Sequence, residues 1–243
     1  MNKFGILVAF AVCCFVSVSA DTCDLTAKDH FNNVEFVDMK RKCILETEDQ
    51  IKKEITASLK YLSLAAYFSR DDVNRPGYAK FFFDAASEER EHAKKLIEYL
   101  QMRGRYFDLE DSAISNINIG SLVKGSEKAE LLSLGSEWMK APEASKNKEV
   151  SAGLNALRTA LKMEAVVTGS IRNLIATCEA EQVEGKKNEI FNDYHFADYL
   201  TGDFLSEQYQ GKRDIAGKIS TLGKMIRDNG AELADYLFDK SLQ

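Results

Sequence analysis

The sequence is poor in residues that interrupt helices, since only two of its 243 residues are proline. A proline inside a helix removes one backbone hydrogen bond and clashes with the preceding turn, so this scarcity permits long uninterrupted helices. The chain also lacks internal repeats, low-complexity tracts and useful lengths of strand-like alternation. Its 29% charged and 45% hydrophobic residues are typical of a folded globular chain and argue against a disordered one.

Apolar runs of membrane-spanning length are absent beyond the first twenty residues. There, Lys3 supplies a positive start, residues 4–18 are nearly continuously apolar, and small residues lead up to a cleavage point after Ala20. The run is too short to span a bilayer comfortably, so it predicts a cleaved secretory signal peptide over residues 1–20. The alternative is an uncleaved membrane anchor. We therefore expect a secreted protein whose mature domain covers residues 21–243, without a membrane partner.

Clusters of basic residues are absent too, and the formal net charge is −6. Because residues 1–20 carry one basic residue and no acid, residues 21–243 retain 31 of the 32 basic residues against 38 acids, a net charge of −7. Proteins that track a phosphate backbone need clustered lysine and arginine, so we expect no nucleic-acid partner. The acidic surplus suits cation handling but is also ordinary for soluble proteins.

Cysteine is scarce, and two of the five, Cys13 and Cys14, lie in the predicted signal peptide. Their removal leaves an odd number, namely Cys23, Cys43 and Cys178. In an oxidising compartment an odd count predicts one disulfide within the chain and one thiol for a partner chain. The pairing stays open, although Cys23 and Cys43 flank the first predicted helix and one of them is the candidate for the cross-chain bond. Three buried free thiols are the alternative.

Helical periodicity, by contrast, runs through most of the sequence. Apolar residues recur at steps of three and four, as at Ile51, Ile55 and Leu59, and turn signals such as Pro76 and Gly230 separate the segments. The first predicted helix passes through Ile51 and ends near residue 72. The others cover residues 76–102, 150–178, 189–228 and 231–239.

The connection over residues 105–148 is too long for a simple turn. Two helices, a long crossover, two more helices and a short fifth helix predict an all-α four-helix bundle. In this arrangement we expect the second and third helices to be parallel neighbours. The alternative is two separate helical hairpins, each of which would leave its apolar face half buried.

The predicted inward face of the second helix carries two polar residues where apolar ones belong. Glu89 and His92 lie one turn apart, in the middle of a stripe that is otherwise formed by Phe82, Ala85, Leu96 and Tyr99. A single Glu-x-x-His pair is a weak signal, because a solvated helix face with a chance histidine gives the same pattern.

The other three long helices repeat this anomaly. Glu164 interrupts an apolar stripe of the third helix, and Gln208 interrupts one of the fourth. Glu54 and Tyr61 lie seven residues apart and share one face of the first helix. The coincidence across four helices favours a shared internal site over a separate surface role for each residue.

Such a site predicts a bound metal. Three buried carboxylates with one histidine, and no lysine or arginine in these stripes, need a compensating positive charge. Carboxylates with imidazole suit iron or manganese better than a thiolate-rich site would. The Glu-x-x-His pair is also a known signature of di-iron carboxylate bundles.

Several segments of the chain resemble eukaryotic ferritin. The resemblance covers most of the mature chain and is carried by residues 57–63, 67–73, 88–93, 153–157, 207–208 and 237–240. The signal peptide, the extra cysteines and residues 198–202 resemble the secreted ferritins of insects and related arthropods. This resemblance implies a ferritin-like bundle with one long crossover and a short fifth helix, and a di-iron domain over residues 21–243.

Within that family the resemblance implies a heavy-type subunit, which has ferroxidase activity. Its ligand set is matched at every position by Glu54, Glu89, His92, Glu164 and Gln208, with Tyr61 beside the metals. By family analogy, Glu54 and His92 bind the first iron, Glu164 the second, and Glu89 bridges them. Gln208 is either a weak ligand or a residue just behind the ligands, and Tyr61 is a hydrogen-bonding or redox neighbour.

The implied activity is oxidation of Fe(II) to Fe(III) by O2, with the product deposited as a ferric mineral inside an oligomeric shell. The resemblance suggests a shell of 24 subunits, either of one kind or mixed with light-type ferritin subunits. Two alternatives are a structural shell subunit with an inactive site and another di-iron carboxylate oxidase. The latter enzymes usually carry a second Glu-x-x-His, which neither His30 nor His195 completes.

The sequence departs from the family pattern in three places. Lys94 stands where a further acidic residue is often found, and Thr201 replaces the second acid of the channel by which iron enters, whereas Asp198 matches the first. The connection over residues 105–148 is longer than the family norm. These departures leave the route of iron into the shell and the role of the long connection open.

Overall fold

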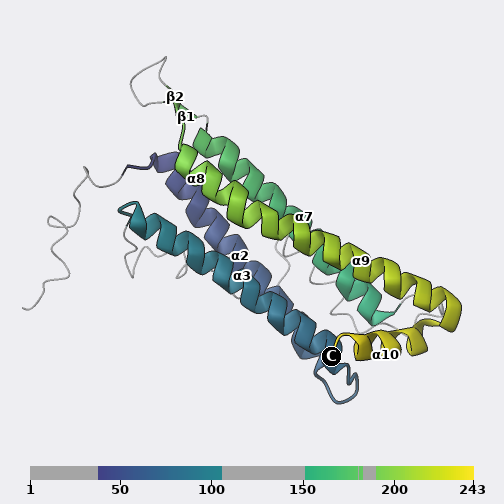
Figure 1. Cartoon of the computed structure of the whole chain (residues 1–243). Helices are drawn as coiled ribbons and strands as arrows, with labels where there is room; N and C mark the ends of the chain where they lie inside the picture. The colour runs from purple at the N-terminus through teal and green to yellow at the C-terminus, as the bar shows by residue number, and fades with distance from the viewer. Residues whose placement is uncertain (1–37, 106–150, 180, 183–189) are drawn as a thin grey trace, which may run out of the picture. The chain divides into compact units, whose positions relative to one another are not determined.

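The computed structural model describes residues 38–105, 151–179, 181–182 and 190–243. The predicted signal peptide, Cys23, His30 and all but the start of the long connection lie outside the described residues. The helices are α2 (Arg41–Phe68), α3 (Pro76–Met102), α7 (Ala152–Glu179), α8 (Tyr194–Tyr199), α9 (Ser206–Asn229) and α10 (Ala231–Ser241) (Figure 1). The prediction of four long helices and a short fifth one is therefore confirmed.

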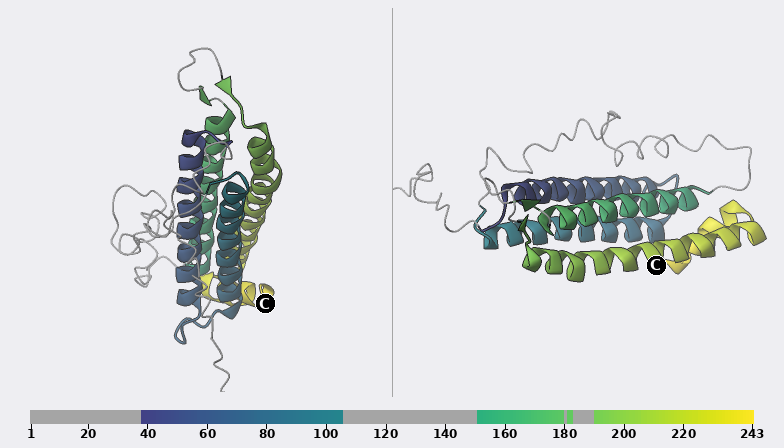
Figure 2. Two further views of the ribbon diagram at one scale, coloured as in Figure 1. Left: turned by 90° about the vertical axis from the view of Figure 1, so that its left-hand side faces the viewer. Right: turned by 90° about the horizontal axis from the view of Figure 1, so that it is seen from above.

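The four long helices lie side by side as a bundle, which Figure 2 shows from two directions. Among the described residues, α2 packs closely against α3 and α7, and α7 packs against α9. The helix α10 closes one end, where it contacts α9, α3 and α7. None of the described helices is both long and apolar enough to cross a bilayer.

The crossover makes α3 and α7 parallel, as predicted. Both begin at the α10 end, where Asp235 accepts hydrogen bonds from the Tyr78 hydroxyl at 3.0 Å and from the Gly153 amide at 3.4 Å. The prediction that these helices are neighbours was wrong, because α7 packs against α2 and α9 instead. Two antiparallel hairpins stacked into a bundle place each helix beside antiparallel partners and leave the parallel pair on a diagonal.

The fourth helix is not the continuous segment over residues 189–228 that the periodicity predicts. A two-residue antiparallel ladder of β1 (Glu181–Gln182) and β2 (Ile190–Phe191) precedes α8. The Asp193 carboxylate caps α8 by accepting a hydrogen bond from the Phe196 amide at 3.1 Å. A π-helical turn, η1 (Leu200–Leu205), then joins α8 to α9. The β-ladder, the Asp193 cap and the π-helical turn therefore divide this segment, although its apolar residues recur at helical spacing throughout.

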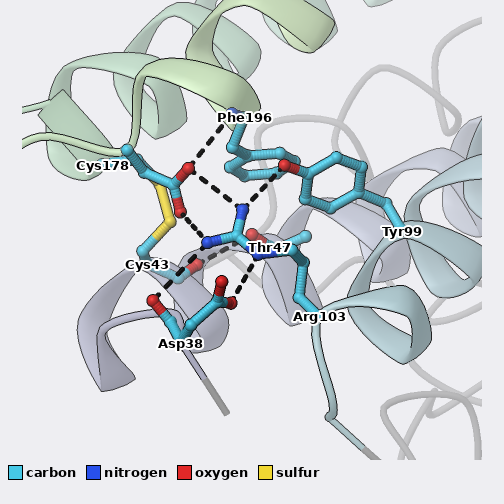
Figure 3. Close-up of a disulfide and its surroundings, with 8 residues drawn as sticks. Asp38, Cys43, Thr47, Tyr99, Arg103, Cys178 and Phe196 are labelled. Atoms are coloured by element: carbon cyan, nitrogen blue, oxygen red, sulfur yellow. Dashed lines mark hydrogen bonds and ion pairs between the residues drawn. A yellow bond between two sulfur atoms is a disulfide. The ribbon is translucent and has the colours of Figure 1, made fainter. Parts of the chain in front are cut away.

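A disulfide between Cys43 and Cys178 ties the start of α2 to the end of α7 (Figure 3). This bond settles the pairing that the sequence left open and leaves Cys23 as the candidate for the cross-chain bond. Beside it, Arg103 at the end of α3 donates to Asp38 at 2.6 Å and pairs with the buried carboxylate of Asp193 at 3.0 Å. Three helices are thus fastened together at the end of the bundle opposite α10.

At the α10 end, the buried carboxylate of Asp239 accepts hydrogen bonds from the amides of Gly77 at 2.8 Å and Tyr78 at 3.0 Å. These are first-turn amides of α3 that have no partner within the helix. A negative charge at this position also complements the helix dipole. The approach requires glycine at position 77, because a Cβ there would lie 2.0 Å from the backbone oxygen of Asp239.

We predict that Asp239→Ala lowers the free energy of unfolding by about 1.5–3 kcal/mol, the range for hydrogen bonds to charged groups. Thermal unfolding followed by circular dichroism measures the change. Asp239→Asn is the matched control, because it keeps an acceptor oxygen and should lose less than the alanine variant. An unchanged unfolding temperature in Asp239→Ala would show that the amide contacts do not stabilise α3.

We also predict that Cys43→Ala/Cys178→Ala lowers the free energy of unfolding by roughly 2–5 kcal/mol. The disulfide closes a loop with a sequence separation of 135, and its removal gives the unfolded chain more conformational entropy. Urea unfolding of the variant should match that of the wild-type protein in reductant. If the oxidised wild type and the variant unfold at the same urea concentration, the disulfide is not stabilising.

Candidate metal centre

All six predicted site residues lie in the core of the bundle. Two come from α2, two from α3, one from α7 and one from α9. Their exposed fractions are 8% or less: Glu54, Tyr61, Glu89, His92, Glu164 and Gln208. The spacing of three, four and seven residues thus placed each of them on the inner face of its helix, as the sequence predicts.

Three of these residues converge on one point. Glu54 Oε2, Glu89 Oε2 and His92 Nδ1 are buried and have no hydrogen-bond partner. The ligand atoms of this group lie within 4.8 Å of one another, and His92 Nδ1 is 3.6 Å from Glu89 Oε2 and 3.9 Å from Glu54 Oε2. A buried polar atom without a partner costs about 1–3 kcal/mol. A cation at this point would satisfy all three atoms at once.

The other oxygen of Glu54 is held from outside the group. Gln50, one turn earlier on α2, donates from its amide to Glu54 Oε1 at 2.7 Å. The Ser170 hydroxyl of α7 in turn donates to Gln50 Oε1 at 2.6 Å. This chain fixes the carboxylate with its free oxygen toward Glu89 and His92. Gln50 was not predicted as part of the site, although its spacing of four residues from Glu54 places it on the same helix face.

Glu164 and Gln208 lie outside the three-residue group, and each of them is held by a hydroxyl group. The Tyr61 hydroxyl donates to Glu164 Oε1, and the Thr168 hydroxyl contacts Gln208 Oε1 at 3.0 Å. The charge of Glu164 also acts directly on Glu89, as its effect on the pKa of Glu89 shows. Glu164 thus lies close to Glu89, beside the three-residue group.

The centre opens into a groove of about 830 Å³ between α3 and α9, and the site residues Tyr61, Glu89, His92, Glu164 and Gln208 form part of its lining. The rest of the lining is rich in acids that the sequence analysis did not assign to the site: Asp84, Glu88, Glu91, Glu207 and Asp214. Of these, Glu207 contacts His92 directly, with 2.9 Å between its Oε2 and His92 Nε2. Glu207 immediately precedes Gln208 in the sequence, and this adjacency could have identified Glu207 as part of the site.

A ferritin-like domain matches residues 45–225 of the chain. The chain belongs to the ferritin family. It is 44% identical over 239 residues to the ferritin heavy chain of Papilio xuthus, covering 98% of this chain and 95% of the relative. It is 46% identical over 208 residues to the ferritin heavy chain of Drosophila melanogaster, covering 86% and 84% of the two chains.

A solved structure supports the same assignment. The secreted ferritin of Trichoplusia ni aligns with a TM-score of 0.62 and 44% identity, over 86% of this chain and 91% of that chain. The resemblance to insect ferritins and the ferritin-like fold are therefore confirmed. The roles of the individual residues in iron binding stay predictions.

The ferritin centre is electrostatically costly when it holds no cation. Burial, followed by the charge of Glu89, raises the pKa of Glu54 well above its ordinary value. Burial and the charge of Glu164 likewise raise the pKa of Glu89. Both carboxyl groups thus resist ionisation in the metal-free protein, and a cation that binds them must displace their protons.

We predict that Glu89→Gln stabilises the metal-free protein at neutral pH. Above the ordinary carboxyl pKa, the unfolded chain releases a proton that folded Glu89 retains, so stability falls with rising pH until the raised pKa is passed. Glu89 contributes about 1.4 kcal/mol to this fall for each pH unit in that window, and the variant lacks this contribution while the smaller fall due to Glu54 remains. Thermal unfolding in chelator from pH 4 to pH 8 measures this difference.

The matched control is Glu98→Gln, which removes an exposed acid from the same helix. It should follow the wild-type curve throughout. The wild type and Glu89→Gln should have similar midpoints near pH 4 and diverge as the pH rises. Parallel curves over the whole range would contradict the prediction.

Proposed function

We propose that the chain is a secreted, heavy-type ferritin subunit that oxidises Fe(II) with O2 at a two-iron site. The observation that carries this proposal is the convergence of three buried, unpartnered ligand atoms from Glu54, Glu89 and His92. The names of the two insect relatives, both ferritin heavy chains, support the same activity.

The family resemblance implies how the residues divide the work. Glu54 and His92 hold the first iron, and Glu89 bridges to a second iron held by Glu164. Gln208 is a weak ligand of the second iron. Two ferrous ions supply two electrons to O2, and hard carboxylate oxygens favour the ferric product.

Tyr61 orients Glu164 by donating a hydrogen bond from its hydroxyl. Burial, together with the charge of Glu164, raises the pKa of the Tyr61 hydroxyl well above its ordinary value. The hydroxyl thus keeps its proton and remains a donor to the carboxylate. The same hydrogen bond reduces the negative charge that Glu164 presents to a cation, which suits a ligand that must release its product.

The groove favours one alternative, another di-iron oxidase with an organic substrate, because it provides space beside the ligand atoms. Its lining argues for the ferritin activity instead. The lining holds more carboxylates, among them Glu88, Glu91 and Asp214, than lysines, and this acidic surplus attracts cations rather than an uncharged organic molecule. We propose that iron passes through this groove on its way to the mineral.

We further propose an oligomeric shell, of 24 subunits by family resemblance, formed from one kind of chain or mixed with light-type chains. Exposed apolar side chains on α10, namely Leu233, Tyr236 and Leu237, support contacts with other subunits. A signal peptide over residues 1–20 and a cross-chain disulfide through Cys23 complete this proposal. The described disulfide supports an oxidising, secretory compartment.

The decisive measurement is aerobic oxidation of Fe(II) by the purified mature protein. We predict a fast initial phase that consumes about two irons per subunit. Glu89→Ala/His92→Ala should slow this phase by at least about 100-fold, since even the loss of a partner behind a ligand costs 10–100-fold. The shell should remain assembled on gel filtration, because neither side chain is exposed to a neighbouring subunit.

Lys94→Ala/Glu98→Ala is the control, since it removes two exposed side chains from the same helix. It should oxidise iron at the wild-type rate. Equal slow rates in the wild type and the ligand variant would instead indicate a structural shell subunit with an inactive site. Loss of the assembled particle in the ligand variant would contradict the separation of site and shell contacts.

A further inference from the structure

The two ring nitrogens of His92 face different surroundings. Nδ1 is buried, has no hydrogen-bond partner, and points to the carboxylates of Glu54 and Glu89. Nε2 lies 2.9 Å from Glu207 Oε2, on the groove side. The residue is thus held between an internal cation site and a single external carboxylate.

This arrangement matters because a neutral imidazole carries one proton on two nitrogens. A histidine can bind a cation through Nδ1 only when the proton is on Nε2. An acceptor at Nε2 selects that tautomer and also fixes the plane of the ring. A carboxylate acceptor further increases the basicity of the nitrogen that binds the metal.

Glu207 is itself fixed in place. Lys95, one turn after His92 on α3, approaches both carboxylate oxygens of Glu207, at 3.2 Å and 3.3 Å. Phe204, in the π-helical turn before α9, lies beside the His92 ring with 5.5 Å between the ring centroids. The lysine thus contacts the glutamate and the aromatic ring contacts the histidine, so each member of the pair has a further partner.

We propose that Glu207 is a positioning residue that holds His92 in the tautomer and orientation required to bind iron through Nδ1, with Lys95 as its anchor. This inference rests on the proposed iron-oxidising function of the same site. Two other roles would place Glu207 in the same location: a direct iron ligand, or one of several acids that attract cations to the groove. The substitutions below separate the three.

Three variants are needed. Glu207→Leu removes the acceptor at similar size, and Glu207→Gln keeps an acceptor oxygen while it removes the charge. Asp214→Asn removes a charge from the same groove without touching His92. It is a matched control, because the Asp214 side chain is 55% exposed and that of Glu207 is 50% exposed.

The measurement is a titration of the metal-free, assembled protein with Co²⁺, followed by the visible absorption of the bound ion. Binding through His92 is the part of the Co²⁺ absorption that is lost in the His92→Ala variant. We expect Glu207→Leu to weaken this binding by about 10-fold or more and to change the absorption spectrum. Glu207→Gln should weaken it by less than about threefold and keep the wild-type spectrum, and Asp214→Asn should change neither. Initial iron oxidation should rank the variants in the same order.

Each other result would overturn the inference. Unchanged binding and an unchanged spectrum in Glu207→Leu would mean that His92 needs no outer partner. Equal losses in the leucine and glutamine variants would indicate a direct ligand, and an equal loss in Asp214→Asn would indicate general attraction by the groove.

Failure of the proposed function gives a different signature. In that case the wild-type protein would bind no Co²⁺ through His92 and would show no fast oxidation of iron. If the wild type binds Co²⁺ through His92 and oxidises iron, but Glu207→Leu does so equally well, only the role of Glu207 is wrong.

Discussion

The burial of ionisable ligands in the middle of a helical bundle constrains everything else in this structure. Glu54 and Glu89 occupy positions where apolar side chains would otherwise pack, and each leaves one oxygen without a partner. Because these buried carboxylates destabilise the folded chain, other parts of the fold must stabilise it. They do so at the two ends, through the Cys43–Cys178 disulfide at one and the Asp239 cap at the other. These two ends therefore hold the helices that carry the ligands.

The polar atoms at the centre fall into two sets. One set faces the converging point and has no protein partner, as with Glu54 Oε2 and His92 Nδ1. The other set faces away and is bound, with Gln50 on Glu54 Oε1 and Glu207 on His92 Nε2. A random packing defect would leave atoms unpaired without such a division. The division implies that the side chains are held ready for a cation rather than left over from imperfect packing.

Helix phase explains why so much of the site could be predicted from the sequence. Glu89 and His92 interrupt an apolar stripe of fixed period, so their inward direction follows from local geometry alone. The Cys43–Cys178 pairing could not be predicted in this way, because only the packed bundle brings the two ends together. The role of Glu207 depends on a contact across 115 residues, and on the π-helical turn that precedes α9. The helix period does not encode either feature.

The two halves of the proposed iron site also differ in how their ligands are supported. His92 is backed by the carboxylate of Glu207, which makes the imidazole a stronger ligand. Glu164 instead accepts a hydrogen bond from the neutral hydroxyl of Tyr61, which withdraws charge from the carboxylate. The proposed ligands of the two halves thus differ in the charge that they present to a cation. Both halves adjoin the acidic groove, because His92 and Glu164 alike form part of its lining.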